Sequence, residues 1–387
     1  MNHIHCLNNI SSYGTDLLSA DYALTDSIDE AQGILVRSAA MHDMDFSENL
    51  LAIARAGAGV NNIPLERCAE EGIVVFNTPG ANANAVKELV LCGLLLASRG
   101  IVAGIEWCKE NADDANIAKT AEKAKKEFAG QEIKGKKLGV IGLGAIGAEV
   151  ANAALGLGME VLGYDPFVSV NAAWKLLPAV QHVTDVADIY RECDYITIHV
   201  PAVAGTIGMI DEEACALMKE GMAFLNFSRD TLVDAPAMAA ALASGKIRAY
   251  VTDFATPEVM KMEHAIVLPH LGASTEEAED NCARMAVLEL MDYIDNGNIT
   301  NSVNYPACSA GVCPADAYRI AVLYNASELA ISQVATILEE AGASFNMMDQ
   351  ARDEHGYALI TLNENLADEV LEGIAELDGA YLVRRVK

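Results

Sequence analysis

The feature that most constrains this chain is a glycine-rich turn between two apolar runs, inside the segment Lys136–Phe167. The run Leu138–Ile141 meets the sequence Gly-Leu-Gly-Ala-Ile-Gly at 142–147, and an amphipathic segment follows. A second apolar run, Glu160–Tyr164, ends at Asp165. This order predicts a strand, a tight turn, a helix and a second strand, which together form a βαβ unit that holds a dinucleotide.

Each glycine of this turn has its own physical task. Gly142 permits the tight turn, Gly144 lets backbone amides approach a pyrophosphate, and Gly147 lets the helix pack closely on the strand. The helix N-terminus attracts the phosphate charge. Asp165 would accept hydrogen bonds from the adenosine ribose and repel a 2′-phosphate, so the sequence predicts NAD rather than NADP.

The composition describes a folded, strongly acidic protein. The 387 residues suggest two or three domains, and a hydrophobic content of 52% with 21% charged residues is typical of globular chains. The net charge of −29 repels nucleic acids and anionic membranes, so we expect neither as a partner. An anionic substrate would need local arginines to overcome this field.

The cysteines and the N-terminus bear on location and metal content. The nine cysteines include no Cys-x-x-Cys pair and no metal-like spacing with histidine, which predicts reduced thiols, a cytoplasmic location and no metal site. The N-terminus has no basic region followed by an apolar stretch, so we expect no signal peptide. The most apolar run, Leu89–Ala97, is shorter than a membrane span and predicts a buried helix.

Three regions are expected along the chain. Residues 1–100 and 283–306 would form one doubly wound α/β domain, residues 101–282 a second, and residues 316–387 a smaller module. In the first region, buried parallel strands are predicted at Gly33–Val36, Leu51–Ala54 and Ile73–Phe76. The long helical pattern Thr275–Asp295 would return the chain to that region.

The second region has a regular strand rhythm after a predicted helix at Ala112–Glu127. Its strands are expected at Leu138–Ile141, Glu160–Tyr164, Tyr195–His199, Ala223–Asn226, Ala249–Thr252 and Ile266–Leu268. Beyond the linker Asn296–Pro314, the patterns predict a strand at 318–325, a helix at 328–341, strands at 344–350 and 357–362, a helix at 367–376 and a strand at 380–386. This βαββαβ order is that of a ferredoxin-like module.

Polar residues follow the predicted strands of the second region. His199-Val200-Pro201 ends one strand, Asn226–Arg229 ends another, Asp253 ends a third, and His270 follows the last. Because ligands of open α/β sheets bind at the carboxyl ends of the strands, these four clusters predict a site there.

These motifs give the chain a resemblance to a known family. They are RAGAGVNNI (55–63), NTPGANANAVKE (77–88), GLGAIG with Asp165, HVP with Thr206, NFSRDTLVD (226–234), DFATPE (253–258) and PHLGASTEEAEDN (269–281). In this order they resemble the D-isomer-specific 2-hydroxyacid dehydrogenases over essentially the whole chain. The C-terminal module resembles an ACT domain, although Asn325-Ala326-Ser327-Glu328 replaces the usual Arg-Pro-Gly turn, which puts serine feedback in doubt.

The resemblance implies a catalytic set of Arg229, Glu258 and His270, with Asp253 touching the nicotinamide carboxamide. Histidine has the side-chain pKa nearest neutrality and suits proton transfer at the substrate hydroxyl. Glu258 could orient the imidazole, and the planar fork of Arg229 could hold the substrate's carboxylate and carbonyl oxygens. The alternatives are a loop histidine, a surface ion pair and a solvated acid.

The remaining expected site residues bind cofactor or substrate. For the cofactor they are Gly142, Gly144, Ala145, Ile146, Gly147, Asp165, His199, Val200, Pro201, Thr206, Phe227, Ser228, Asp253, Gly272, Ala273 and Thr78. For the substrate they are Arg37, Arg55, Gly57, Ala58 and Gly59, and a surface ion pair is the alternative for either arginine.

The family resemblance implies NAD-dependent oxidation of a small anionic 2-hydroxy acid by a homodimer or homotetramer. We expect D-3-phosphoglycerate as substrate and 3-phosphohydroxypyruvate as product, in L-serine biosynthesis. Reduction of glyoxylate or hydroxypyruvate, and a non-enzymatic NAD(H)-sensing role like that of the related corepressors, remain the alternatives. Two departures bear on the site: Asn61 stands where the family usually has Asp, and Asp230 where it usually has Gly.

Overall fold

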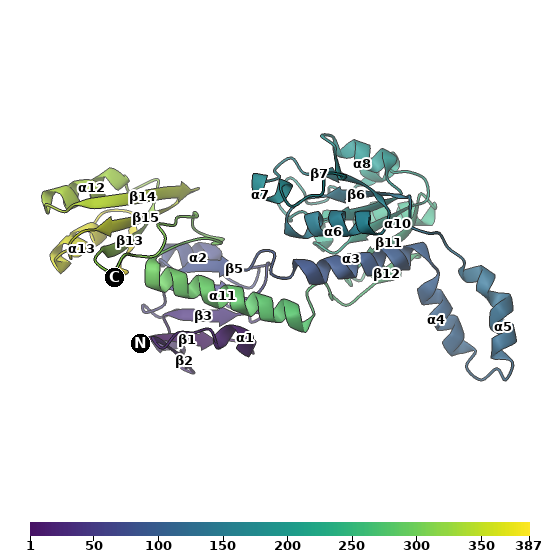
Figure 1. The fold of residues 1–387 in the computed structure, drawn as a ribbon, viewed down its shortest axis with the longest axis horizontal. Helices are drawn as coiled ribbons and strands as arrows, with labels where there is room; N and C mark the ends of the chain where they lie inside the picture. Colours follow the sequence, from purple (N-terminus) through teal and green to yellow (C-terminus); the bar gives the residue numbers. More distant parts are fainter. The chain divides into compact units, whose positions relative to one another are not determined.

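A computed structural model describes all residues, 1–387, and the chain forms two compact units. Unit 1 comprises Met1–Asn82 and Glu276–Lys387, and unit 2 comprises Ala83–Thr275 (Figure 1). The chain therefore passes between the units twice, at 82–83 and at 275–276.

Unit 1 contains a five-stranded parallel sheet in the order β2-β1-β3-β4-β5. Its strands are β1 (Asn2–Cys6), β2 (Tyr22–Thr25), β3 (Gly33–Val36), β4 (Ala52–Arg55) and β5 (Val74–Asn77). Its helical elements are α1 (Ser12–Thr15), η1 (Ile28–Glu30), α2 (Leu65–Glu70) and α11 (Glu276–Asn296). The three strands predicted here are confirmed, and β3 is buried at every position because helices and loops cover both faces.

The long helix α11 holds this sheet through one apolar face. Its residues Ala286, Leu290 and Tyr293 are fully buried in the core that also contains Ala54 of β4 and Phe76 of β5. At its N-terminal end Gly14 of α1 approaches Ala283 so closely that a Cβ would collide with the helix backbone. The predicted helix Thr275–Asp295 is thus confirmed to within one residue at either end.

Unit 2 contains a seven-stranded parallel sheet in the order β12-β11-β10-β9-β6-β7-β8, which is the predicted doubly wound arrangement. Its strands are β6 (Lys137–Ile141), β7 (Glu160–Tyr164), β8 (Gln181–His182), β9 (Tyr195–Ile198), β10 (Met222–Asn226), β11 (Ile247–Thr252) and β12 (Ala265–Val267). Its helical elements are α3 (Ala83–Ser98), α4 (Ile101–Glu110), α5 (Ile117–Ala124), η2 (Lys125–Phe128), α6 (Ala145–Gly156), α7 (Val170–Ala173), α8 (Val186–Glu192), α9 (Glu212–Leu217), η3 (Asp230–Leu232), α10 (Ala235–Ala243) and η4 (Val259–Lys261).

The predicted helix Ala112–Glu127 is wrong in its first turn. The structure has the separate helices α4 and α5, and α5 begins only at Ile117. The carboxylate of Asp114 accepts hydrogen bonds from the backbone N–H of Asn116 and the hydroxyl of Thr120, so it favours a turn before the helix. The two helices run as a hairpin that projects from the rest of the unit (Figure 1).

The two units meet at residues 82–83 and 275–276, whereas the predicted domain boundaries lie at 100 and 282. Helix α3 belongs to unit 2, since Gly93 packs against Leu225 and Phe227 of the seven-stranded sheet region. At the other crossing, the first turns of α11 already belong to the core of unit 1, where Cys282 is buried.

The C-terminal module is a four-stranded antiparallel sheet with two helices, and the predicted ferredoxin-like order is confirmed. Its elements are β13 (Tyr318–Asn325), α12 (Ile331–Glu340), β14 (Phe345–Arg352), β15 (His355–Leu362), α13 (Asp368–Ala375) and β16 (Ala380–Arg385), with the strands in the order β14-β15-β13-β16. One face packs on α12 and α13 around Val334 and Ile374. The other contributes Leu323 and Leu359 to the core of unit 1.

None of the helices by itself combines the length and the apolar composition of a membrane-spanning segment. Helices α3 and α4 meet that requirement only as a pair, bent by 69°.

Candidate active site

The glycine turn of unit 2 has the geometry that its sequence predicts. Gly142 has a φ of 90°, and a Cβ at this position would collide with the carbonyl oxygen of His199. A Cβ at Gly147 would collide with the carbonyl oxygen of Gly142, whereas nothing lies within 4 Å of the Cβ position at Gly144. The turn is therefore tight at both ends and open at the middle glycine, next to the N-terminus of the 12-residue helix α6. Ala145 and Ile146 form the first turn of that helix.

Asp165 stands at the end of β7, beside the turn. Its Oδ2 accepts a hydrogen bond from the backbone N–H of Leu143 at 2.9 Å, and its Oδ1 accepts one from the N–H of Phe167 at 2.9 Å. These two bonds fix the carboxylate at the mouth of the turn. Each carboxylate oxygen retains further lone pairs that could accept hydrogen bonds from ribose hydroxyls.

Asp253 is a buried carboxylate with one oxygen left free. It is 2% exposed, and its Oδ2 accepts a hydrogen bond from the backbone N–H of Gly272 at 2.8 Å. Its Oδ1 is buried without a partner. Burial raises the pKa of this carboxyl, while the Gly272 N–H and the charges of His270 and Arg229 oppose the rise. The free oxygen is an acceptor suited to the N–H₂ of a carboxamide.

His270 lies beside Asp253 in a constrained backbone conformation. Its φ is 49°, a region that non-glycine residues rarely adopt, and its N–H donates to the carbonyl oxygens of Asp253 at 2.8 Å and Leu268 at 3.1 Å. The exposed imidazole contacts the ring of Phe254 edge to face, with 5.2 Å between ring centroids. Asp253 and His270 are thus brought together, as the strand-end argument predicts.

Arg229 follows β10 and is also exposed. Its Nη1 donates to the carbonyl oxygen of Ser228 at 2.6 Å, and its own carbonyl oxygen accepts from Asn226 Nδ2 at 2.8 Å. Asn226 is fully buried and is linked to the next strand, because Thr252 Oγ1 donates to its carbonyl oxygen at 2.8 Å. A rigid strand end therefore presents a guanidinium whose charge acts on Asp253.

Glu258 does not make the predicted hydrogen bond to the imidazole of His270. It is exposed, stands directly before η4, and makes no hydrogen bond or ion pair with His270. It lines a cavity of about 190 Å³ together with Phe254, Tyr250 and Met262. The irregular loop after Asp253 places the Phe254 ring, rather than the Glu258 carboxylate, against the imidazole.

His199 follows β9 beside the glycine turn, where its carbonyl oxygen lies against Gly142. Its Nε2 shares a hydrogen bond of 2.9 Å with Thr197 Oγ1, and its Nδ1 is buried without a partner. Burial lowers the pKa of His199 to about 3, so the ring stays neutral at physiological pH. It is ill suited to proton transfer near neutrality.

The other predicted cofactor residues of unit 2 surround these groups on neighbouring strand ends. Val200 and Pro201 continue from His199, and the hydroxyl of Thr206 donates to the carbonyl oxygen of Pro201. Ser228 Oγ donates to the carbonyl oxygen of Ile198 at 2.7 Å, which joins the ends of β10 and β9. Phe227 is buried in the unit's core, Gly272 is buried beside Asp253, and Ala273 follows it.

The predicted substrate residues lie in unit 1, at the carboxyl ends of β3, β4 and β5. Arg37 Nη1 forms an ion pair with Glu279 of α11 at 2.7 Å, and Arg55 Nε donates to the carbonyl oxygen of Arg37 at 3.1 Å. Gly57 has a φ of 146° and accepts a hydrogen bond from the N–H of Thr78 at its carbonyl oxygen. The carbonyl oxygen of Ala58 accepts one from Asn77, and Gly59 follows it.

Two residues with a part in this site were not singled out from the sequence. Phe254 contacts the imidazole of His270, and Thr197 fixes the ring of His199. Asn226, which belongs to a predicted strand-end cluster, links β10 to the turn at Arg229.

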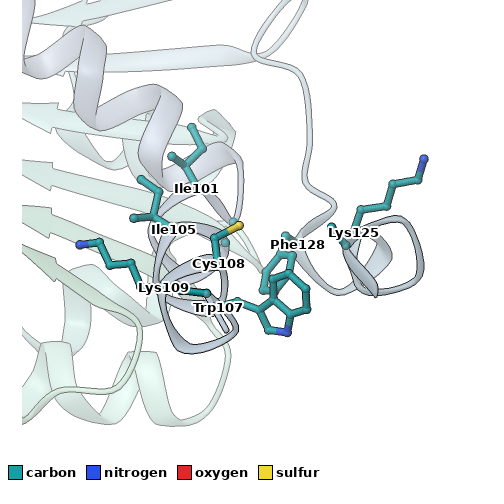
Figure 2. A pocket seen from close by; sticks show the side chains of 11 residues that line it. Ile101, Ile105, Trp107, Cys108, Lys109, Lys125 and Phe128 are labelled. Carbon is teal, nitrogen blue, oxygen red and sulfur yellow. The ribbon is translucent and has the colours of Figure 1, made fainter. Parts of the chain in front are cut away.

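A second concave surface of unit 2 lies on the projecting hairpin. It has a volume of about 650 Å³ and is lined by apolar side chains of α4 and η2, among them Ile101, Ile105, Trp107 and Phe128 (Figure 2). The rings of Trp107 and Phe128 lie 6.1 Å apart. Cys108, Lys109 and Lys125 also line this surface, but most of its lining residues are apolar or small, which is typical of a packing surface.

Comparison with known proteins places these features in a family. Residues 92–272 match the model of the D-isomer specific 2-hydroxyacid dehydrogenase NAD-binding domain. The chain is 35% identical over 292 residues to the D-3-phosphoglycerate dehydrogenase of Methanocaldococcus jannaschii, covering 73% of this chain and 53% of that protein. It is 36% identical over 280 residues to the hydroxypyruvate reductase of Thermotoga maritima, covering 69% and 85%.

The chain spans about half the length of the curated phosphoglycerate dehydrogenases that it matches, 54% of the human protein at 33% identity over 75% of this chain. Among solved structures, the NAD⁺-bound 3-phosphoglycerate dehydrogenase of Entamoeba histolytica has a TM-score of 0.62 and 26% identity, and the match covers 78% of this chain and 98% of that one. The open glycine turn, the fixed Asp165 and the free Oδ1 of Asp253 fit the cofactor that this family's domain binds. The chain belongs to the D-isomer specific 2-hydroxyacid dehydrogenases, and residues 92–272 correspond to their NAD-binding domain.

Proposed function

We propose that this protein is an NAD-dependent dehydrogenase that oxidises D-3-phosphoglycerate to 3-phosphohydroxypyruvate. The observation that carries the dehydrogenase chemistry is that Arg229, Asp253 and His270 follow the adjacent paired strands β10, β11 and β12, with the His270 N–H bonded to the Asp253 carbonyl oxygen. A proton-transfer group and a fixed cation beside a carboxamide acceptor are what hydride transfer at a hydroxyl-bearing carbon requires.

Each residue then has a separate task. NAD, held by the turn at Gly142–Gly147, by Asp165 and by Asp253, supplies the hydride acceptor. His270 takes the proton of the substrate hydroxyl during oxidation and returns it during reduction. Arg229 holds the substrate's carboxylate and C2 oxygen, which stabilises the negative charge that builds on that oxygen.

Phosphoglycerate is favoured over unphosphorylated acids by two arguments. The relatives that are 33% to 35% identical to this chain include phosphoglycerate dehydrogenases from an archaeon and from mammals. The strand ends of unit 1 also carry Arg37 and Arg55, cations of the kind that a phosphate needs in a chain of net charge −29. The second candidate is hydroxypyruvate reduction. It is favoured by the match to the Thermotoga maritima hydroxypyruvate reductase, because this match covers 85% of that protein.

The test compares 2-oxo acids with and without phosphate. Purified protein is assayed for NADH oxidation with 3-phosphohydroxypyruvate, hydroxypyruvate and glyoxylate, and Arg55→Ala is assayed beside Arg67→Ala. Arg67 pairs with Glu71 on the surface of α2 and serves as the control arginine. We expect the phosphorylated acid to have the highest kcat/KM, and Arg55→Ala to raise its KM about tenfold. Equal kcat/KM for all three acids would leave only the general dehydrogenase assignment.

We further propose that the protein is a homodimer joined through the hairpin of α4 and α5. Ile101 and Ile105 of α4 are 40% and 51% exposed, and the apolar surface of the hairpin also includes Trp107 and Phe128. An exposed apolar surface of this kind can pack against the same surface of a second copy. Ile105→Glu should give monomers by light scattering, whereas the control Leu177→Glu, 49% exposed in the loop between α7 and β8, should not.

The nine cysteines are all free, which supports the cytoplasmic, reducing location that we propose.

A further inference from the structure

The backbone of His270 is held more firmly than its ring. Two hydrogen bonds from its N–H fix a left-handed backbone conformation, yet no hydrogen bond of the ring to a protein group is present. The side chain has several rotamers available in such an exposed loop. Its recorded ring contact is with Phe254, at 5.2 Å between centroids and an interplanar angle of 73°.

Phe254 is itself well anchored. Its N–H donates to Thr252 Oγ1 at 3.2 Å, and Thr252 Oγ1 donates to the carbonyl oxygen of the buried Asn226 at 2.8 Å. Phe254 is half-buried and lines the cavity of about 190 Å³ beside Tyr250 and Met262. Its backbone is therefore fixed, with its ring on one side of the imidazole.

The carboxylate that could orient the imidazole instead does not reach it. Glu258 lines the same cavity as Phe254 and is exposed to solvent, without a hydrogen bond to His270. The sequence order explains this arrangement, because Phe254 directly follows Asp253, whose carbonyl oxygen holds the His270 backbone. The side chain that contacts the imidazole is thus the aromatic ring of Phe254.

We propose that Phe254 is a positioning residue that holds the imidazole of His270 in the orientation needed for proton transfer. This inference rests on the proposed dehydrogenase function for its kinetic consequence. An edge-to-face aromatic contact favours one ring orientation by an amount that corresponds to about a tenfold population difference. Phe254 touches neither substrate nor cofactor in this role, so it should affect the chemical step more than binding.

The kinetic test uses three variants of the full chain. Phe254→Leu keeps apolar volume without the ring, Phe254→Tyr keeps the ring, and Phe46→Leu is the control. Phe46 is a half-buried phenylalanine of unit 1 that stacks with Arg67, 4.8 Å from its ring. We expect Phe254→Leu to lower kcat about tenfold with an unchanged Kd for NADH and a larger solvent deuterium isotope effect. Phe254→Tyr should stay within about twofold of the unsubstituted protein, and Phe46→Leu should be unchanged.

A second measurement does not depend on activity. The ring protons of His270 should carry a ring-current shift in the NMR spectrum, present in the unsubstituted protein and Phe254→Tyr and lost in Phe254→Leu. Unchanged kcat in Phe254→Leu, or an equal loss in both Phe254 variants, would overturn the positioning role. If the unsubstituted protein reduces no 2-oxo acid, the proposed function fails, and an unaltered His270 ring signal in Phe254→Leu would refute the positioning separately.

Discussion

Two regions of this molecule contain an arginine in very different surroundings, one exposed and one buried. Arg229, at the strand ends of unit 2, is exposed and donates to a single carbonyl oxygen. Arg319 of β13 is 1% exposed, and its guanidinium donates to the carbonyl oxygens of Asn296, Gly311 and Ala310 and to Thr361 Oγ1. The Arg229 guanidinium remains available to a ligand. The hydrogen bonds of the Arg319 guanidinium instead fix the linker 296–314 to the C-terminal module.

The contrast extends to the groups around each arginine. Near Arg229, Asp253 Oδ1 is buried without a partner. Near Arg319, Tyr357 donates to the carbonyl oxygen of Gly297 at 2.6 Å, and Arg384 covers the ring of Tyr293 at 4.4 Å. Tyr293 Oη and Arg384 Nε are nevertheless buried without partners in this region, so an unsatisfied atom alone does not mark a ligand site. Asp253 Oδ1 differs from these atoms by its place at the carboxyl ends of parallel strands, where ligands of open α/β sheets bind.

The largest expected effect is on catalysis at the strand ends of unit 2, the region that contains Arg229, Asp253 and His270. His270→Asn should lower kcat by about 10²–10⁴-fold, because asparagine tolerates the positive φ but cannot transfer the proton. Thermal unfolding and the Kd for NADH should be unchanged, since the imidazole is exposed. Retention of more than a tenth of the activity would remove His270 from the proton-transfer role.

Substitution of the buried Arg319 should instead change the free energy of unfolding. Arg319→Met leaves several buried carbonyl oxygens without donors and should lower the free energy of unfolding by about 4 kcal/mol, measured with urea. Arg352→Met is the matched control, because Arg352 is exposed on the same sheet and makes one 3.3 Å hydrogen bond to Ser302. It should change stability by less than about 0.5 kcal/mol.

A buried acid of unit 1 also carries an unsatisfied polar atom, and its effect should appear in the pH dependence of stability. Burial raises the pKa of Glu289 to about 7, and its Oε2 has no partner. A raised carboxyl pKa means that the folded state keeps a proton which the unfolded chain loses above about pH 4.5. The associated stability is present below that pH and is lost as the pH rises through the window from 4.5 to 7.

Glu289→Gln should therefore be the more stable form at pH 8, by up to about 3 kcal/mol, and nearly equal at pH 4.5. Urea unfolding at both pH values measures the difference. The same stability gap at both pH values would show that the carboxyl does not titrate in this window.

The smallest expected effect concerns His199, with the opposite pH dependence. Its folded pKa is lowered to about 3, so the unfolded chain binds a proton below about pH 6.5 that the folded protein does not. Stability is thus intact above pH 6.5 and falls as the pH decreases, by about 2 kcal/mol at pH 5. His199→Gln should abolish this loss in urea unfolding, and a loss of equal size in the variant would assign it to other groups.

Local pattern determined much of this protein. The glycine spacing at 142–147, the apolar runs such as Glu160–Tyr164, and the acid at Asp165 predicted the βαβ unit because turn geometry and strand burial act over short stretches of chain. The strand-end positions of Arg229, Asp253 and His270 followed from the rule that parallel strands end at one edge. The order βαββαβ likewise predicted the C-terminal module.

Contacts between segments distant in sequence were decided only by the tertiary structure. Nothing local to Arg319 indicates that the linker at 310–311 supplies its acceptors, or that the second face of the module's sheet joins the core of unit 1. The loop after Asp253 likewise determined that Phe254, and not Glu258, lies against His270. Such pairings depend on packing and on loop conformation, whose small energy differences a residue pattern does not encode.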